Sequence, residues 1–393
     1  MRSVSLSLLL IAVLLPGLQT AHAENRFALV IAAGEFPADS PYAARTLQGP
    51  QYDTRLMTSL LLWRFGIQAH NIRVIGLDAQ ARNAIAPGLS DGGRHATYQA
   101  IREGFDWLKH QASLPHDVAV VYYAGHGTQI YNPDKNTAHV NSEALVPYDI
   151  GRFGRNLVWD VEIKEWLQSI ASQHKTVIID TCYSGDMIRM RGDDDAEGLP
   201  GAVVSRGLVT ERVVDHPSSS KTAEARQDNL PSGTTLLAAC GKSERAFEKA
   251  LLGGGSRPDI SIGEFTWALY LTLCRNQQPL TASQVCTQIK KRLRQRGRTQ
   301  TPQVLGLGDR SFIGEAPWKA GVYVPIVEKT AKASVLGVGW LAGVRGGSWF
   351  IPRAQPSGAV RIGDESLNWF ETTLPLPFLK VISNQTVAVQ TFP

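Results

Sequence analysis

Short apolar runs that stop at a glycine or a polar residue alternate along this chain with amphipathic stretches. Runs typical of buried strands cover residues 27–31, 71–77, 117–127, 175–180 and 234–239, and a last one begins at Pro302. Apolar residues at helical spacing cover residues 55–64, 97–110, 161–171, 265–274 and 283–293. Strands and helices that alternate in this way predict an α/β fold, a mostly parallel sheet with helices on both faces.

Three stretches interrupt the alternation. Residues 49–53 hold Gly49, Pro50 and Asp53 and are predicted to be a polar loop, as are residues 129–154, which are broken by Val146-Pro147. Residues 189–232 combine an acidic cluster, a serine run and scattered arginines. An aperiodic insertion of this length is typical of a functional or disordered segment.

From residue 315 to residue 393 the composition shifts to Gly, Val and Trp in short alternating runs, such as VGWLAGVRGGSWFI. This pattern predicts a small all-β module that joins the α/β part near Pro317.

Residues 1–23 are predicted to be a signal peptide. Arg2 supplies a positive charge, residues 6–18 an apolar core, and Ala21-His22-Ala23 a small-x-small cleavage site. The apolar core is too short to span a membrane, and no later stretch reaches about 20 apolar residues. We therefore expect cleavage after Ala23, a periplasmic or secreted bacterial protein, and no stable membrane insertion after cleavage. An uncleaved membrane anchor is the alternative.

The charge balance predicts no nucleic-acid partner. The net charge is +5 over 393 residues, and the basic residues do not gather into patches interleaved with aromatic residues. The densest basic run, residues 290–296, lies on an amphipathic helical pattern. It is interpreted as a solvated helix face, with an anionic partner as the alternative.

Four cysteines in a chain of 393 residues do not make a disulfide scaffold. Cys240 lies in the apolar stretch LLAAC and is predicted to be a small buried hydrophobe. Cys274 and Cys286 lie on consecutive helical segments, and a single bridge between them is left open. Cys182 lies at the end of the predicted strand that runs to Asp180.

Two strand ends carry the residues of a nucleophile and a base. His126 lies between two glycines at the end of one strand, and Cys182 follows the strand that runs to Asp180. In open α/β sheets the carboxyl ends of parallel strands are where ligands bind. A histidine can lower the pKa of a nearby thiol and later protonate a leaving amine. The amides of Gly127 and Cys182 are candidate oxyanion donors, since the glycines leave the backbone open.

The two motifs around these residues resemble those of a known family. YYAGHGTQ at residues 122–129 and DTCYSGD at residues 180–186 are similar to the histidine and cysteine motifs of the caspase-like cysteine peptidases, in particular the metacaspase and bacterial caspase-like branch. The order and separation of the motifs also agree. Supporting similarity comes from LVIAAGEF, LQGPQYD, ALVPYD and TPQVLG. The resemblance covers about residues 26–314, and the peptidase domain is predicted to span residues 24–314, with an insertion at about 189–232.

The resemblance implies a cysteine endopeptidase with His126 as the base and Cys182 as the nucleophile, and it requires no third catalytic acid. The residue two before the nucleophile lines the primary specificity pocket in this family, and here it is Asp180. Asp53 falls where metacaspases place a second pocket acid. Two carboxylates would pair a guanidinium or ammonium group, which predicts protein or peptide substrates cleaved after Arg or Lys. A turn cap for Asp180 and a helix N-cap for Asp53 are the structural alternatives.

No cofactor is assigned from the sequence. Metacaspases often bind calcium through acids between the two motifs. Here that segment holds Glu143, Asp149 and Asp160, but Trp159 and Val161 stand where more acids are expected. Calcium is therefore kept only as an alternative, and the acidic cluster at residues 193–195 is interpreted as a solvated loop. The resemblance also makes the insertion a candidate self-processing segment, since Arg206, Arg212 and Lys221 would suit a pocket for basic residues.

Two other functions remain possible from the sequence. One is a catalytically silent caspase-like scaffold that binds through its C-terminal module. The other is a different Cys-His hydrolase, an acyltransferase or an amidase, on a similar sheet. A thiol-directed, Arg-bearing probe distinguishes the first alternative, and peptide libraries compared with small amides distinguish the second.

Overall fold

The computed structural model describes most of the α/β part of the chain and short strands beyond it. The described residues are 24–131, 141–151, 155–181, 183–184, 203–205, 230–241, 243–251, 260–276 and 278–314, with 326–329, 333–336, 349–350, 360–361 and 379–382 in the C-terminal part. The expected signal peptide lies outside them, as does most of the expected insertion.

A seven-stranded sheet forms the centre of the described α/β part, with the strand order β15-β11-β8-β4-β1-β2-β3. All neighbours pair in parallel except β15, which is antiparallel to β11. Both β1 and β4 are buried along their whole length, which explains their nearly continuous apolar sequences. The strands are β1 Arg26–Ala33, β2 Ile72–Ile75, β3 Ser90–Asp91, β4 Val118–Gly125, β8 His174–Asp180, β11 Thr234–Ala238 and β15 Gln303–Gly306.

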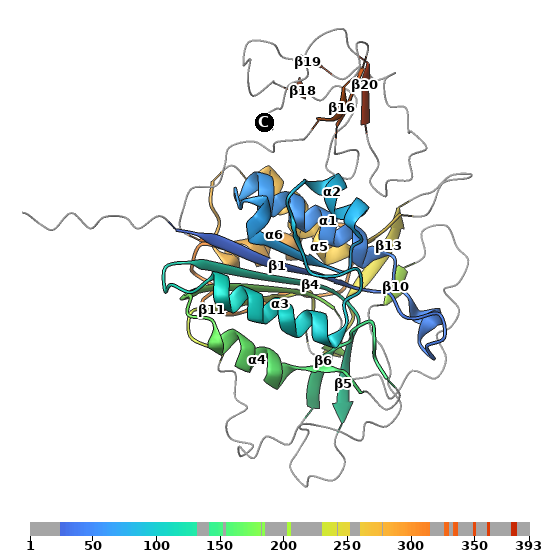
Figure 1. The fold of residues 1–393 in the computed structure, drawn as a ribbon, viewed down its shortest axis with the longest axis vertical. Coiled ribbons are helices and arrows are strands. Elements are labelled where there is room, and N and C mark those ends of the chain that lie inside the picture. The colour runs from blue at the N-terminus through green and yellow to red at the C-terminus, as the bar shows by residue number, and fades with distance from the viewer. Residues whose placement is uncertain are drawn as a thin grey trace, which may run out of the picture.

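Helices cover both faces of this sheet, which confirms the expected α/β class (Figure 1). One face packs against α1 Gly49–Ser59, its π-helical continuation η2 Leu60–Arg64, α2 Ala79–Ile85, α5 Glu264–Arg275 and α6 Ala282–Gln295. The other face packs against α3 Tyr98–Gln111 and α4 Asp160–Ser169. Alternate residues of each strand enter the two cores, as Val120 and Val121 of β4 do.

Smaller sheets surround the carboxyl edge of the central sheet. β5 Gly127–Tyr131, β6 Asn141–Leu145 and β7 Val158–Trp159 form one, and β10 Val203–Ser205, β13 Phe247–Leu251 and β14 Ile260–Gly263 form another. A two-stranded sheet joins β9 Tyr183–Ser184 to β12 Ser243–Glu244. Short 3-10 helices lie at η1 Ala43–Arg45 and η3 Ala69–Asn71.

The described strands of the C-terminal part are all antiparallel, as expected for an all-β module. β16 Ile326–Lys329, β17 Ala333–Leu336 and β20 Leu379–Ile382 form a three-stranded sheet, and β18 Trp349–Phe350 pairs with β19 Val360–Arg361.

Two expectations were wrong, and one open question is answered. Residues 49–53 are not a loop, because α1 begins at Gly49 with Pro50 in its first turn, where proline's missing N–H is harmless. The stretch 129–154 is not all loop, because β5 and β6 pair across it. Their sequences are polar and short, so they carry little apolar periodicity. The bridge between Cys274 and Cys286 that the sequence left open is not formed, since neither residue is in a disulfide.

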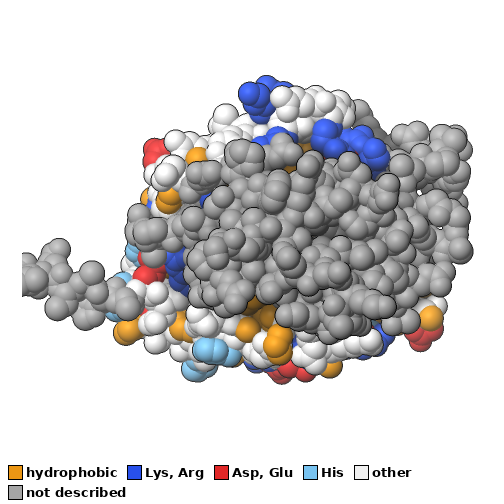
Figure 2. All heavy atoms as spheres, turned by 90° about the horizontal axis from the view of Figure 1, so that it is seen from above, with side chains coloured by type: hydrophobic (Ala, Val, Ile, Leu, Met, Phe, Trp, Pro, Cys, Tyr) orange, Lys and Arg blue, Asp and Glu red, His pale blue; other side chains and the backbone are white. Residues whose placement is uncertain are grey.

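Two arginines in and directly after α6 bond to side chains of α5. Arg296 pairs with the buried Glu264, and Arg292 Nε donates to Thr272 Oγ1 at 3.0 Å. In Figure 2, Lys and Arg side chains and Asp and Glu side chains both occur on the described part of the visible face. Among the described residues, no helix is long and apolar enough to cross a membrane.

Candidate active site

His126 directly follows β4, and the packing of that strand against β1 sets its position. A Cβ atom on Gly125 would lie 2.2 Å from the carbonyl oxygen of Ala33, so only glycine fits before the histidine. The carbonyl oxygen of His126 accepts from Val146 N at 3.1 Å and from the Tyr123 hydroxyl at 2.9 Å. The missing side chain of Gly125 therefore allows β4 to pack closely against β1.

The His126 ring is buried and held on two sides by the β1–α1 loop, residues 34–48. Its Nε2 lies 2.7 Å from the carbonyl oxygen of Arg45, and its ring stacks on Phe36 with centroids 5.6 Å apart. Leu47 N donates to Gly34 O at 2.8 Å, which closes this loop at its ends. Because a carbonyl oxygen can only accept, Nε2 carries the proton, and Nδ1 is then the nitrogen that accepts one.

The Arg45 carbonyl orients the His126 ring, and sequence reasoning did not find this contact. No signal in the chain could have found it, because every residue has a carbonyl group. Phe36 ends the stretch LVIAAGEF, but the sequence does not show that its ring stacks on His126.

Cys182 lies outside the described residues, but its neighbours on both sides are described. β4 and β8 are adjacent, and Ala124 is paired with Asp180. Each of these residues lies two positions before its motif residue, His126 or Cys182. The strands that begin directly after the motif residues, β5 and β9, are also in contact. The backbone therefore brings the two motifs to neighbouring positions at one edge of the sheet, and Gly127 begins β5 there.

Asp180 ends β8 and is fully buried. Its Oδ2 accepts from Thr266 Oγ1 at 2.6 Å and from Thr266 N at 3.3 Å. Thr266 lies in the first turn of α5, so both bonds connect the end of β8 to a helix that is distant in the sequence.

Asp53 lies within α1 and is also fully buried, so the N-cap alternative is wrong. Its Oδ1 accepts from Gly263 N at 2.9 Å, and Gly263 is the N-cap residue of α5. The structure therefore brings both predicted pocket acids to the amino end of α5. The positive end of a helix dipole and its unbonded amides favour carboxylates at this position.

A third buried acid, Glu248 of β13, lies beside this pair and was missed by sequence reasoning. Its Oε2 accepts from Gly49 N at 3.2 Å, at the start of α1, and its Oε1 accepts from Ser261 Oγ at 3.0 Å. Glu248 is also the β13 partner of Gly263, which donates to Asp53. In the sequence, Glu248 lies in the short run FEKAL, which has too few β-forming residues to predict a strand or a buried acid.

α1 also carries a buried cation, Arg55, whose side chain is 2% exposed. Burial lowers the pKa of Arg55 to about 10, against the opposing charges of Tyr52 and Asp78. Residues two apart on a helix do not face each other, so Arg55 and Asp53 point to different sides of α1.

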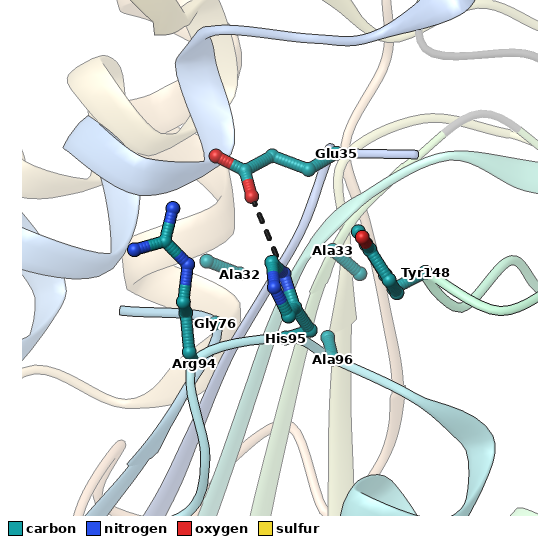
Figure 3. A pocket seen from close by; sticks show the side chains of 8 residues that line it. All are labelled: Ala32, Ala33, Glu35, Gly76, Arg94, His95, Ala96 and Tyr148. Atoms are coloured by element: carbon teal, nitrogen blue, oxygen red, sulfur yellow. Dashed lines mark ion pairs between the residues drawn. The ribbon is translucent and has the colours of Figure 1, made fainter. Parts of the chain in front are cut away.

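A shallow pocket lies at the carboxyl ends of β1 and β2, next to the loop that holds His126 (Figure 3). Glu35 Oε2 lies 3.6 Å from His95 Nδ1, and the His95 ring stacks on Tyr148 with centroids 4.0 Å apart. Arg94 lines the same pocket. Glu35 directly precedes Phe36, so this pocket is adjacent to the histidine along the sheet edge.

Two of the acids considered for calcium contact protein groups. Asp149 Oδ1 accepts from Tyr98 N at 2.8 Å, at the start of α3, and Asp160 lies 3.6 Å from Lys164. Within the described ranges, no group of three or more His, Cys, Asp or Glu residues could hold a metal ion.

Comparisons with known proteins agree with the motifs. A family model described as caspase domain matches residues 25–309. Metacaspase-4 of Arabidopsis thaliana is 28% identical over 152 residues, which are 38% of this chain and 32% of that protein. This chain therefore spans only part of that relative's length. A crystal structure of a protein from Geobacter sulfurreducens aligns with 74% of this chain and 100% of its own, at 16% identity and a TM-score of 0.46.

Proposed function

Because this chain belongs to the caspase-domain family of peptidases, we propose that it is a cysteine endopeptidase with Cys182 as nucleophile and His126 as base. One observation carries the proposal: the pairing of Ala124 with Asp180 puts the two motifs at adjacent strand ends. A thiol and an imidazole at such positions have the chemistry of nucleophile and general base.

The tautomer of His126 gives the order of proton transfers. Nδ1 accepts the thiol proton of Cys182, and the thiolate attacks the carbonyl carbon of the scissile peptide. The developing oxyanion is bound by the amides of Gly127 and Cys182. The imidazolium then donates its proton to the leaving amine, and the C–N bond breaks. Water attacks the resulting thioester, His126 takes its proton, and the thiol is released with the acid product.

The bond from Nε2 to the Arg45 carbonyl keeps the ring orientation through this cycle. It also places positive charge of the imidazolium next to a carbonyl dipole, which favours the charged intermediate. An orienting carboxylate is therefore not needed for the ring to be held.

The substrate side chain on the acyl side is proposed to be Arg or Lys. Asp180, Asp53 and Glu248 meet where β14 ends and α5 begins, so a substrate side chain that binds among them must supply positive charge. A guanidinium or ammonium group would do so. Since the three carboxylates are buried, the substrate must open a path to them as it binds.

Export is part of the proposal. The positive start, apolar core and Ala21-His22-Ala23 site support cleavage after Ala23 and a periplasmic or secreted location. The substrates are then proteins or peptides of that compartment with exposed basic residues.

The test is hydrolysis of a peptide library by the protein that begins at Glu24. Wild type should cleave after Arg or Lys, and Cys182→Ala should abolish cleavage. Cys286→Ala is the matched control, because the Cys286 thiol is buried in α6 and burial raises its pKa. Cleavage that survives Cys182→Ala would remove the assignment. Hydrolysis of small amides without peptides would favour an amidase instead.

A further inference from the structure

A buried chain of hydrogen bonds joins β4, α5 and β8 and ends at Asp180. The Tyr122 hydroxyl lies 2.6 Å from Thr266 Oγ1, and Thr266 Oγ1 lies 2.6 Å from Asp180 Oδ2. Tyr122 and Asp180 have no exposed surface, and Thr266 is 1% exposed. Bonds of this length in a buried site are strong and resist rearrangement.

The direction of the chain follows from the number of protons. An ionised carboxylate only accepts, so the single hydroxyl proton of Thr266 goes to Asp180. The Thr266 oxygen must then accept, and the Tyr122 hydroxyl donates to it. Thr266 adds its own amide, 3.3 Å from the same carboxylate oxygen. Asp180 Oδ1 takes part in neither bond.

The same turn of α5 also anchors the second acid. Gly263 N donates to Asp53, three residues before Thr266. The first turn of α5 therefore sets where both carboxylates lie relative to each other, and Thr266 is the side chain in it that contacts Asp180.

We propose that Thr266, oriented by Tyr122, is a positioning residue for substrate specificity: it fixes the Asp180 carboxylate so that it receives the cationic side chain of the substrate. This inference rests on the proposed function. Thr266 does not touch the reacting atoms, so its loss acts on recognition of the basic side chain rather than on bond cleavage.

The test compares a peptide with arginine before the scissile bond and the same peptide with citrulline, a neutral isostere. Thr266→Val removes the hydroxyl and keeps the shape. It should raise KM for the arginine peptide about tenfold, change kcat less than about twofold, and lower the arginine-to-citrulline ratio of kcat/KM about tenfold. Thr266→Ser should restore the wild-type ratio.

The matched control is Thr272→Val on the same helix. Thr272 is also buried, but its hydroxyl donates to Ala268 O at 2.8 Å within α5 and accepts from Arg292 Nε of α6 at 3.0 Å, away from Asp180. It should leave the ratio unchanged, which separates loss of a buried hydroxyl in general from loss of the contact with Asp180.

A double-mutant cycle with Asp180→Asn tests whether Thr266 acts through the carboxylate. In the Asp180→Asn background, Thr266→Val should lower the ratio less than about twofold further. An undiminished effect there, or an unchanged ratio in Thr266→Val alone, would overturn the inference. If Asp180→Asn alone leaves the ratio unchanged, it is the proposed specificity that fails. Should Thr266→Val not fold, Tyr122→Phe decides: a lowered ratio supports the inference and an unchanged one overturns it.

Discussion

Replacement of Asp180 by asparagine removes one charge from the proposed pocket with little change of shape. The asparagine side-chain oxygen can still accept the bond from Thr266 Oγ1, which is 2.6 Å long in the wild type. Asp180 has no exposed surface. Its charge is therefore weakly screened by solvent, and the substrate cation should sense the loss strongly.

The expected magnitude follows from the value of a charged hydrogen bond. A bond to a charged partner contributes about 1.5–3 kcal/mol, so the preference for arginine over citrulline should fall about 10- to 150-fold. Asp53 and Glu248 remain charged in the variant, so some preference for arginine should persist. Cleavage of the citrulline peptide, which carries no charge, should change much less.

The assay is kcat/KM for the arginine and citrulline peptides with wild type and Asp180→Asn. Asp117→Asn is the control, since Asp117 is a buried acid at the opposite end of β4. Asp117 accepts from Leu114 N at 2.9 Å and from Asn25 Nδ2 at 3.2 Å. The Asp117 variant should lower the free energy of unfolding without altering the arginine-to-citrulline ratio.

An equal fall of kcat/KM for both peptides in Asp180→Asn would refute the reasoning, because it would show a loss of folding or catalysis rather than of charge recognition. A ratio unchanged from wild type would mean that the substrate cation does not reach this carboxylate.

Three further predictions concern the ring of His126, a buried arginine and a partly buried tyrosine. Phe36→Ala removes the stack on His126 and should lower kcat about 2- to 10-fold with KM nearly unchanged, measured with the arginine peptide; a change confined to KM would contradict this. Arg55→Met replaces a buried cation whose pKa burial lowers to about 10. The variant should raise the free energy of unfolding by about 1–3 kcal/mol in urea titrations. A lower free energy of unfolding would show that interactions in the folded protein compensate for the burial of this charge. Burial and the bond to Glu162 raise the pKa of Tyr98 to about 12. Between about pH 10 and 12 the folded protein keeps a proton that the unfolded chain releases, so the free energy of unfolding should fall as the pH rises through this range. The fall should be less steep in Tyr98→Phe.

Local patterns were enough to place the histidine and cysteine motifs. The apolar runs before His126 and Cys182 have the composition of strands buried on both faces, and β4 and β8 form where they end. A parallel sheet brings such strand ends to one edge, so the sequence alone predicted a shared edge for these residues.

Local patterns misled where polar residues lie inside regular structure. Asp53 follows Gly49 and Pro50, which are typical of loops, yet α1 begins at Gly49 because its amide is capped by Glu248. Strands β5 and β6 were missed because their short sequences, GTQIY and NSEAL, show no clear alternation of apolar and polar residues, and their backbone pairing cannot be seen in a sequence.

The chain by itself determined the α/β class, the strand ends that carry His126 and Cys182, and the acidic nature of Asp180, since these depend on the kind and order of residues. Tertiary structure alone decided what holds them: the Arg45 carbonyl against His126, Thr266 against Asp180, and Gly263 against Asp53, which lie 81, 86 and 210 residues apart in the chain. Their donors and acceptors are backbone groups or a common hydroxyl, which leave no mark in a sequence until the fold brings them within hydrogen-bond distance.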